Sequence, residues 1–155
     1  MAIDSDQVAR LLVELGERTP RIESIVQEAD APRWAIELED GYVVLAEFDG
    51  GRNRLSLETD LGRPPEEHRL ATCEALMLFT SVEHASAGFA MALGEPAGEF
   101  QLCGHIAMSE IDFADVQSAF LTFADHGQHW RDVVENGAQQ SALSTNDVLN
   151  TAFLA

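Results

Sequence analysis

The stretch that most constrains this fold is Pro65–Val82 (PEEHRLATCEALMLFTSV), a predicted helix that is apolar almost all round. It opens with proline and two carboxylates, Glu66 and Glu67, which are favoured in the first turn of a helix. A helix on the surface of a monomer shows one apolar stripe and a polar back, but Glu74 and Thr80 do not make a polar back here. We therefore expect this helix to be covered on two sides.

Two arrangements would cover both sides of this helix. A second copy of the chain would pack its own helix against the first, giving a twofold homodimer with a self-complementary interface. Alternatively, the domain wraps the helix completely. We favour the homodimer, because a chain of 155 residues has little else with which to cover the second side. The predicted dimer contacts lie along the helix, and they are Leu70, Cys73, Leu76, Met77 and Thr80.

The composition fits a single folded domain with a polar tail. Apolar residues make up 46% of the chain, and a chain of this length buries roughly two-thirds of its unfolded surface. We expect the domain to span residues 1–137 and the polar segment 138–155 to be mobile.

The charge is the unusual part of the composition. The chain has 27 acidic residues against 9 basic ones, a formal net charge of −18 and a pI near 4.3, and every basic residue is arginine. Such a field repels nucleic acid and anionic membranes. No apolar run is long enough to span a bilayer. The N-terminal sequence MAIDSDQVARLL lacks the basic-then-apolar order of a secretion signal, so we expect a cytoplasmic protein with no nucleic-acid partner and no membrane insertion.

The first half of the chain predicts one helix and three strands. A helix capped by Asp4 or Ser5 should run to about Leu15 and end at Gly16. The segment 17–33 fits either a short strand or a helical turn. Alternating apolar residues then predict three strands in a meander at 34–38, 42–48 and 55–59, with Asp40-Gly41 as a tight turn.

The second half predicts the central helix, a hairpin and a last helix. The hairpin strands are expected at 89–93 and 99–108, and an amphipathic helix begins near Ser109 or Asp112 and ends at Asn136-Gly137. The predicted order is therefore α-βββ-α-ββ-α. It is an α+β fold in which helices cover a twisted antiparallel sheet.

Motifs for catalysis or cofactor binding are not found. Without lysine there is no P-loop, and there is no nucleophile elbow. Cys73 and Cys103 are isolated and are expected to be reduced thiols rather than a disulfide. His126 and His129, with two nearby aspartates, are the nearest approach to a metal site, but they are expected on the solvated side of the last helix. We therefore predict no enzyme, no cofactor and no metal.

What remains is apolar surface. The first helix has a stripe at helical spacing, and strand 42–48 is apolar on both faces. Together with the central helix these faces exceed what one thin sheet can hide, and such a surplus is typical of protein-binding surfaces. The alternative for the first helix is that its stripe simply packs on the sheet.

These segments resemble the class I type III secretion chaperones of Gram-negative bacteria, the family of small acidic Tir-type effector chaperones. The resemblance runs from about Val8 to Asn136. It rests on the following segments: LLVELG, WAIELEDGYVVLAEFD, RLSLETDLG, EALMLFTSV, FAMALGEPAGEFQLCGHI and FADHGQHW. Such chaperones often carry an asparagine after the paired leucines of the central helix, whereas this chain has Phe79 and Thr80 there.

The resemblance implies a homodimer joined through the central helix and wrapped by the extended N-terminal segment of a secreted effector. On this basis we expect a cytosolic chaperone that keeps one or a few effectors competent for secretion. The candidate client contacts are apolar residues of the first helix and the sheet, namely Val8, Leu12, Leu15, Trp34, Val43 and Leu45. The alternative function is a dimeric regulatory or adaptor domain of similar fold that binds a folded partner.

Overall fold

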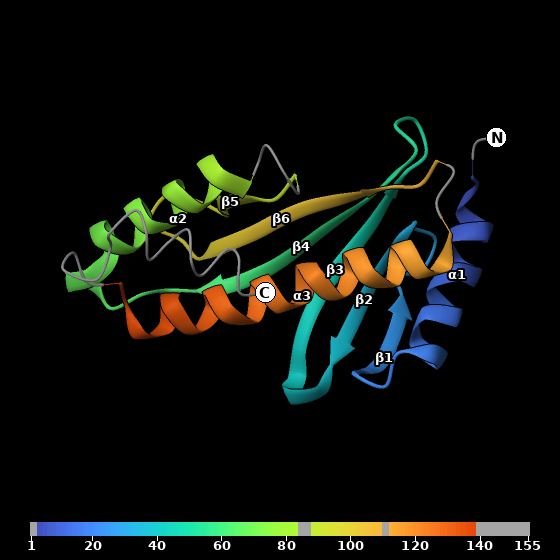
Figure 1. The fold of residues 1–155 in the computed structure, drawn as a ribbon, viewed down its shortest axis with the longest axis horizontal. Helices are drawn as coiled ribbons and strands as arrows, with labels where there is room; N and C mark the ends of the chain where they lie inside the picture. Colours follow the sequence, from blue (N-terminus) through green and yellow to red (C-terminus); the bar gives the residue numbers. More distant parts are fainter. Residues whose placement is uncertain (1–2, 84–87, 110–111, 139–155) are drawn as a thin grey trace. The chain divides into compact units, whose positions relative to one another are not determined.

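The computed structural model describes residues 3–83, 88–109 and 112–138, and it has an α+β fold with one antiparallel sheet (Figure 1). The helices and strands in chain order are α1 Ser5–Arg18, β1 Ile22–Gln27, β2 Arg33–Leu38, β3 Tyr42–Asp49, β4 Arg54–Gly62, α2 Arg69–Glu83, β5 Ala90–Leu93, β6 Phe100–Ala107 and α3 Phe113–Asn136. Short 3-10 turns, η1 Glu39–Gly41 and η2 Glu66–His68, precede β3 and α2. The strand order across the sheet is β1-β2-β3-β4-β6-β5.

The predicted fold class is confirmed, and one strand is added to the predicted order. The segment whose structure the sequence left open contains β1, which pairs antiparallel with β2. The observed order is therefore α-ββββ-α-ββ-α rather than α-βββ-α-ββ-α. Of the predicted polar tail, only Ala138 belongs to the described residues.

The chain divides into two compact units. The first holds residues 1–58 and 105–121, and the second holds residues 59–104 and 122–155. Strands β4 and β6 and helix α3 contribute residues to both units. Each unit is described below by itself.

In the first unit, α1 begins as its sequence predicts. Asp4 caps the helix by accepting a hydrogen bond from the Gln7 N–H at 2.8 Å, and the Gln7 side chain accepts from the Asp4 N–H in return. The predicted end at Gly16 is wrong, because the helix continues to Arg18. Gly16 instead allows close packing, since a Cβ there would lie 3.2 Å from the side chain of Ile25 on β1.

Strands β2 and β3 show why the sheet of the first unit has one buried and one open face. Their residues alternate strictly, so that one face of β3 is buried from Tyr42 to Phe48 while the residues between are exposed. The predicted tight turn between them is confirmed, because Asp40 and Gly41 have φ values of 76° and 69°.

In the second unit, aromatic side chains hold α2 against the C-terminal part of α3. The ring of Phe79 on α2 lies 5.0 Å from that of Trp130 and 5.6 Å from that of His126, centroid to centroid. Phe89, which precedes β5, packs edge-on against Phe123 at 5.4 Å. Such tilted and edge-to-face pairs are favourable geometries for aromatic rings, so the side of α2 that carries Phe79 is fixed toward the core.

Candidate protein-binding surfaces

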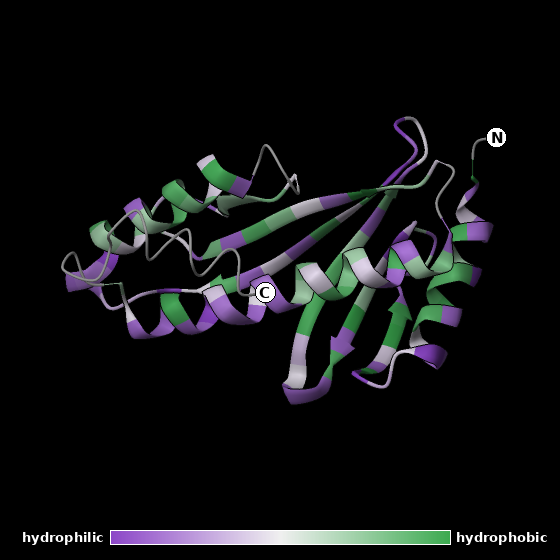
Figure 2. Ribbon diagram, viewed as in Figure 1, coloured by the Kyte–Doolittle hydropathy of each residue, from purple (hydrophilic) through white to green (hydrophobic). Residues whose placement is uncertain are grey.

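The side of α2 opposite its core contacts is exposed and largely apolar. Leu70 and Met77 are each 67% exposed, Leu78 is 40% exposed, and Cys73 is half-buried between them. We define the outer face of α2 as Leu70, Cys73, Glu74, Met77, Leu78 and Ser81. Figure 2 shows hydrophobic residues along much of α2. These positions recur every three or four residues, which is the spacing of a seam that receives a second helix.

Two of the predicted dimer contacts lie elsewhere on α2. Leu76 is only 2% exposed and belongs to the core side. Thr80 is half-buried, and its hydroxyl donates to the Leu76 carbonyl at 3.1 Å and accepts from the Met91 N–H of β5 at 2.9 Å. Thr80 thus connects α2 to the edge strand β5, and Leu76 offers nothing to a partner in this structure.

The second candidate surface is the open face of the sheet in the first unit. Its apolar residues form a row across three strands, because Val26 on β1 pairs with Ala35 on β2, and Ala35 pairs with Leu45 on β3. Val26 is 61% exposed and Leu45 is 43% exposed, and Val43, two residues from Leu45 on the same face, is 39% exposed. A row of this kind on an unburied sheet face is a candidate site for a protein partner.

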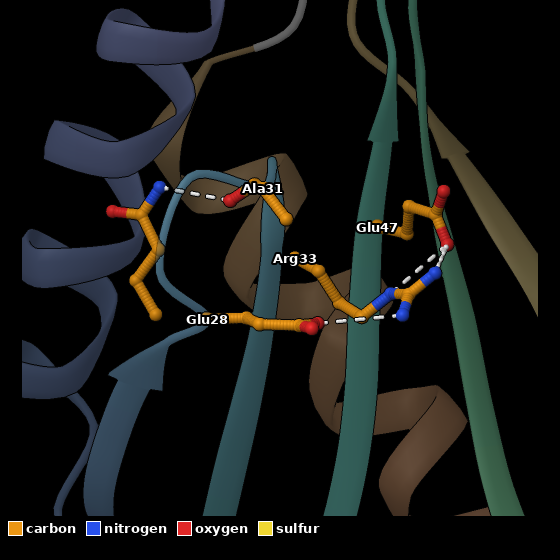
Figure 3. Close-up of polar contacts among 5 residues, drawn as sticks. Glu28, Ala31, Arg33 and Glu47 are labelled. Carbon is orange, nitrogen blue, oxygen red and sulfur yellow. Dashed lines mark hydrogen bonds and ion pairs between the residues drawn. The ribbon is translucent and has the colours of Figure 1, made fainter.

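Charged side chains surround this apolar row. Arg33 lies between Glu28 and Glu47, with nitrogen–oxygen distances of 3.3 and 3.0 Å (Figure 3). Hydrogen bonding and charge from Glu47, with a smaller contribution from Glu28, raise the pKa of the Arg33 guanidinium. On the other side of the row, the Glu37 carboxylate accepts a hydrogen bond from the Ser24 hydroxyl at 3.1 Å.

Four of the predicted client contacts are core residues. Val8, Leu12 and Leu15 on α1 have no exposed surface, and Trp34 on β2 is 3% exposed. The alternative that the sequence left open for the α1 stripe therefore holds, since the stripe is buried inside its own unit. Only Val43 and Leu45 of the six residues lie at the surface. Val26 and Leu78 are exposed apolar residues that were not among the predicted contacts. Within the regularly paired part of β1, Val26 lies on the open face because it pairs with Ala35.

The histidines of α3 differ in their surroundings, and one expectation about them is wrong. His126 was expected on the solvated side of the helix but is only 5% exposed, because its ring packs against Phe79 and against Phe89 at 5.6 Å each. Burial lowers the pKa of His126, and Glu83 partly opposes that shift. His129 is exposed, and partial burial of its ring lowers its pKa as well. Neither ring belongs to a cluster of three metal-binding side chains within residues 3–83, 88–109 and 112–138.

A pocket of about 760 Å³ lies where the start of α1 meets the loop between β1 and β2. Its carboxylates include Asp4, Glu28 and Asp30, but Asp4 caps α1 and Glu28 binds Arg33. Among the described residues no basic side chain lines the pocket, and its one hydroxyl belongs to Ser5. The geometry there offers no acid–base pair.

None of the described helices combines the length and apolarity that a membrane span requires. Cys73 and Cys103, both among the described residues, are thiols that are not joined in a disulfide, as predicted.

Comparison with known proteins places the fold. No protein-family model matches the sequence, and no curated protein sequence matches it significantly. Solved structures do match. A chain of the ExsC–ExsE complex superposes with a TM-score of 0.68 at 19% identity, covering 84% of this chain and 96% of that one. A chain of the HopA1–SchA chaperone–effector complex gives a TM-score of 0.63 at 17% identity, over 84% and 98% of the two chains.

A third match is the crystal structure of the type III secretion chaperone SycH from Yersinia pestis in complex with a stable fragment of YscM2. It gives a TM-score of 0.57 at 15% identity and covers 78% of this chain and 97% of that one. At these identities the likeness concerns the fold. The chain has the fold of the class I type III secretion chaperones, as its sequence led us to expect.

Proposed function

We propose that this protein is a cytoplasmic type III secretion chaperone that forms a homodimer and binds the non-globular N-terminal segment of one or a few effectors. Its action is to hold that segment soluble and competent for secretion, without catalysis and without a cofactor. The fold supports this proposal, because the similar solved structures include a chaperone–effector complex and a chaperone bound to a protein fragment.

The observation that carries the proposal is the outer face of α2. Leu70 and Met77 lie two helical turns apart, and each leaves two-thirds of its surface exposed. Leaving such side chains in water forfeits on the order of 1.5–3 kcal/mol for each one that could be fully buried. A second α2 in a twofold arrangement would cover them with the same residues, since a twofold interface uses one patch on both copies. Glu74 is the one charged residue of the outer face.

The client surface is proposed on the open face of the sheet, at Val43 and Leu45 with Val26 beside them. Disordered clients bind by placing apolar side chains into complementary surfaces in an extended conformation. Ordering such a segment costs roughly 2–5 kcal/mol of the gross interaction, so the contact must be extensive. The open face provides exposed apolar side chains on β3 and on the edge strand β1, with the half-buried Ala35 of β2 between them.

The dimer proposal is tested with Met77→Arg. The substitution brings two like charges, one from each copy, into the apolar part of the interface beside the twofold axis, and burying them there is strongly unfavourable. We expect the variant to sediment as a monomer while its circular dichroism stays unchanged. Val13→Arg is the matched control, because Val13 is also an exposed apolar helix residue but lies on α1 in the first unit. An unchanged dimer for Met77→Arg would count against this interface.

The client proposal is tested by co-expression followed by limited proteolysis. The protein is co-expressed with the product of the neighbouring gene and purified, and protease is added to the complex. We expect a protected fragment from the N-terminal region of the client, and the fragment should be unfolded once it is separated from the chaperone. Recovery of a folded, protease-resistant partner would instead favour the regulatory or adaptor function.

A further inference from the structure

The open face of the sheet has a specific charge pattern around its apolar row. Paired residues place two parallel rows on this face of the first unit. One row runs Val26, Ala35, Leu45 and Glu58, and the neighbouring row runs Glu28, Arg33, Glu47 and Ser56. Glu37 lies on the other side of the apolar row, where it pairs with Val43. These positions hold four glutamates and a single arginine.

The arginine is already neutralised by its neighbours. Its guanidinium contacts both Glu28 and Glu47, and both carboxylates remain more than half exposed at 56%. Two carboxylates around one cation leave a net negative charge at that end of the face (Figure 3). Glu37 and Glu58 add two further carboxylates, and in the next row Arg54 pairs with Asp49, so the face keeps an excess of negative charge around its apolar centre.

The spacing of the open face suits an extended chain. Neighbouring strands lie about 4.8 Å apart, so the row from Val26 to Leu45 spans roughly 10 Å. In an extended segment, side chains that point to the same side are about 7 Å apart. Two apolar residues separated by one position would therefore cover the row. A long side chain next to them can reach Glu37 or Glu47, which lie about 7 Å along the strands on either side of the row, or Glu58, which follows Leu45 in the row.

We infer that the open face recognises an extended polypeptide in which alternate apolar residues are flanked by arginine or lysine. This inference rests on the proposed function and specifies the chemistry of the client. The apolar row supplies contact area, and the surrounding carboxylates select basic side chains against acidic ones. Salt should then affect client binding and dimer formation in opposite directions. Added salt weakens the binding of a basic client, whereas it strengthens the pairing of two copies that each carry a charge of −18.

The test uses the full-length protein and three labelled synthetic peptides in fluorescence anisotropy. All three carry the same two alternating valine and isoleucine positions in a serine background. The flanking positions carry arginine in the first peptide, glutamine in the second and glutamate in the third. Exposed ion pairs contribute up to about 1 kcal/mol each, so we expect the arginine peptide to bind roughly tenfold more tightly than the glutamate peptide at low salt. The difference should shrink in about 0.5 M NaCl.

Two variants locate the binding site, and a third serves as the control for net charge. Glu37→Gln/Glu47→Gln removes two carboxylates beside the row and frees Arg33 from one partner, so the arginine peptide should lose about fivefold in affinity. Glu66→Gln/Glu67→Gln makes the same change in net charge on η2 in the second unit and should have no such effect. Leu45→Ser should weaken all three peptides alike.

The outcomes separate this inference from the proposed function. If the three peptides bind equally and Leu45→Ser weakens the binding of all of them, the charge selectivity is overturned and the proposed chaperone function is unaffected. Binding that Leu45→Ser does not weaken, or failure of all three peptides to bind, would overturn the assignment of the open face. The proposed function itself fails only if co-expression also yields no protected client fragment.

Discussion

Replacing Met77 by alanine tests the proposed dimer interface quantitatively. Full burial of a methionine side chain stabilises by about 1.5–3 kcal/mol, and Met77 is 67% exposed in the protomer. Covering the exposed part therefore contributes roughly 1–2 kcal/mol for each copy. Each copy contributes one Met77 to a twofold interface, so Met77→Ala removes two such side chains from the dimer. The substitution should therefore weaken the dimer by about 2–4 kcal/mol, or roughly 30- to 700-fold in dissociation constant.

The assay is sedimentation equilibrium over a range of protein concentrations, with the dissociation constant fitted for the wild type and the variant. Val13→Ala is the control, since Val13 is 58% exposed but lies on α1, outside the proposed interface. Circular dichroism establishes that both variants are folded. Identical dissociation constants for the wild type and Met77→Ala would refute the reasoning, because no other described feature buries that side chain.

Further predictions concern salt, acidity and the core. Raising NaCl from about 0.05 to 0.5 M should tighten the dimer, because screening reduces repulsion between two copies of charge −18; a dimer that weakens with salt would indicate a polar interface instead. Burial lowers the folded-state pKa of His126 below its ordinary 6.5, so the unfolded state binds the proton first, and stability should fall as the pH drops below about 6.5. In thermal melts from pH 5 to 7, His126→Phe should reduce the dependence of stability on pH, whereas His105→Asn, at an exposed position, serves as the control and should not. The same dependence of stability on pH in both variants would argue against a buried neutral imidazole at His126. Leu12→Asp should unfold the first unit rather than merely weaken client binding, because Leu12 is fully buried; a native circular dichroism spectrum would contradict this. Asp4→Ala should cost about 0.5–2 kcal/mol in denaturant unfolding through loss of the α1 cap, and an unchanged midpoint would show that the cap contributes nothing.

The central helix shows how far a sequence pattern reaches. Apolar residues occur on nearly all sides of α2, and this pattern correctly predicted a helix with more hydrophobic surface than one side can bury. Leu70 and Met77 are indeed exposed. The pattern did not determine which residues face outward, because apolar side chains occupy nearly every position. The rotation of the helix is set by tertiary contacts such as those of Phe79 with α3, which join residues about fifty positions apart, and the hydrogen bond from the Met91 N–H to Thr80.

The first helix illustrates a different limit. A stripe at helical spacing shows that one face of α1 must be buried, but it does not say whether the chain itself or a partner buries it. The structure resolves this in favour of the chain, since Val8, Leu12 and Leu15 have no exposed surface. The client surface was therefore overestimated on α1, whereas the two strand residues Val43 and Leu45 were placed on a surface that is in fact open.

The sequence left the structure of β1 open between a strand and a helical turn, and it placed His126 on the solvated side of its helix. The pairing of β1 with β2 shifts register between Ile22 and Ser24, and this irregularity breaks the alternation by which strands are recognised in sequence. His126 lies beside polar residues in the sequence, and its burial depends on Phe79 and Phe89 from elsewhere in the chain. Both features follow from tertiary contacts that no local pattern encodes.

The central claim, that the outer face of α2 joins two copies, is tested most directly by oxidative footprinting of Met77 at several protein concentrations. Brief hydroxyl-radical exposure and mass spectrometry would report its oxidation rate, with the buried Met108 as an internal reference. If the outer face of α2 joins two copies, Met77 is protected at high concentration and becomes reactive on dilution below the dimer dissociation constant. Rapid oxidation of Met77 at every concentration would contradict it.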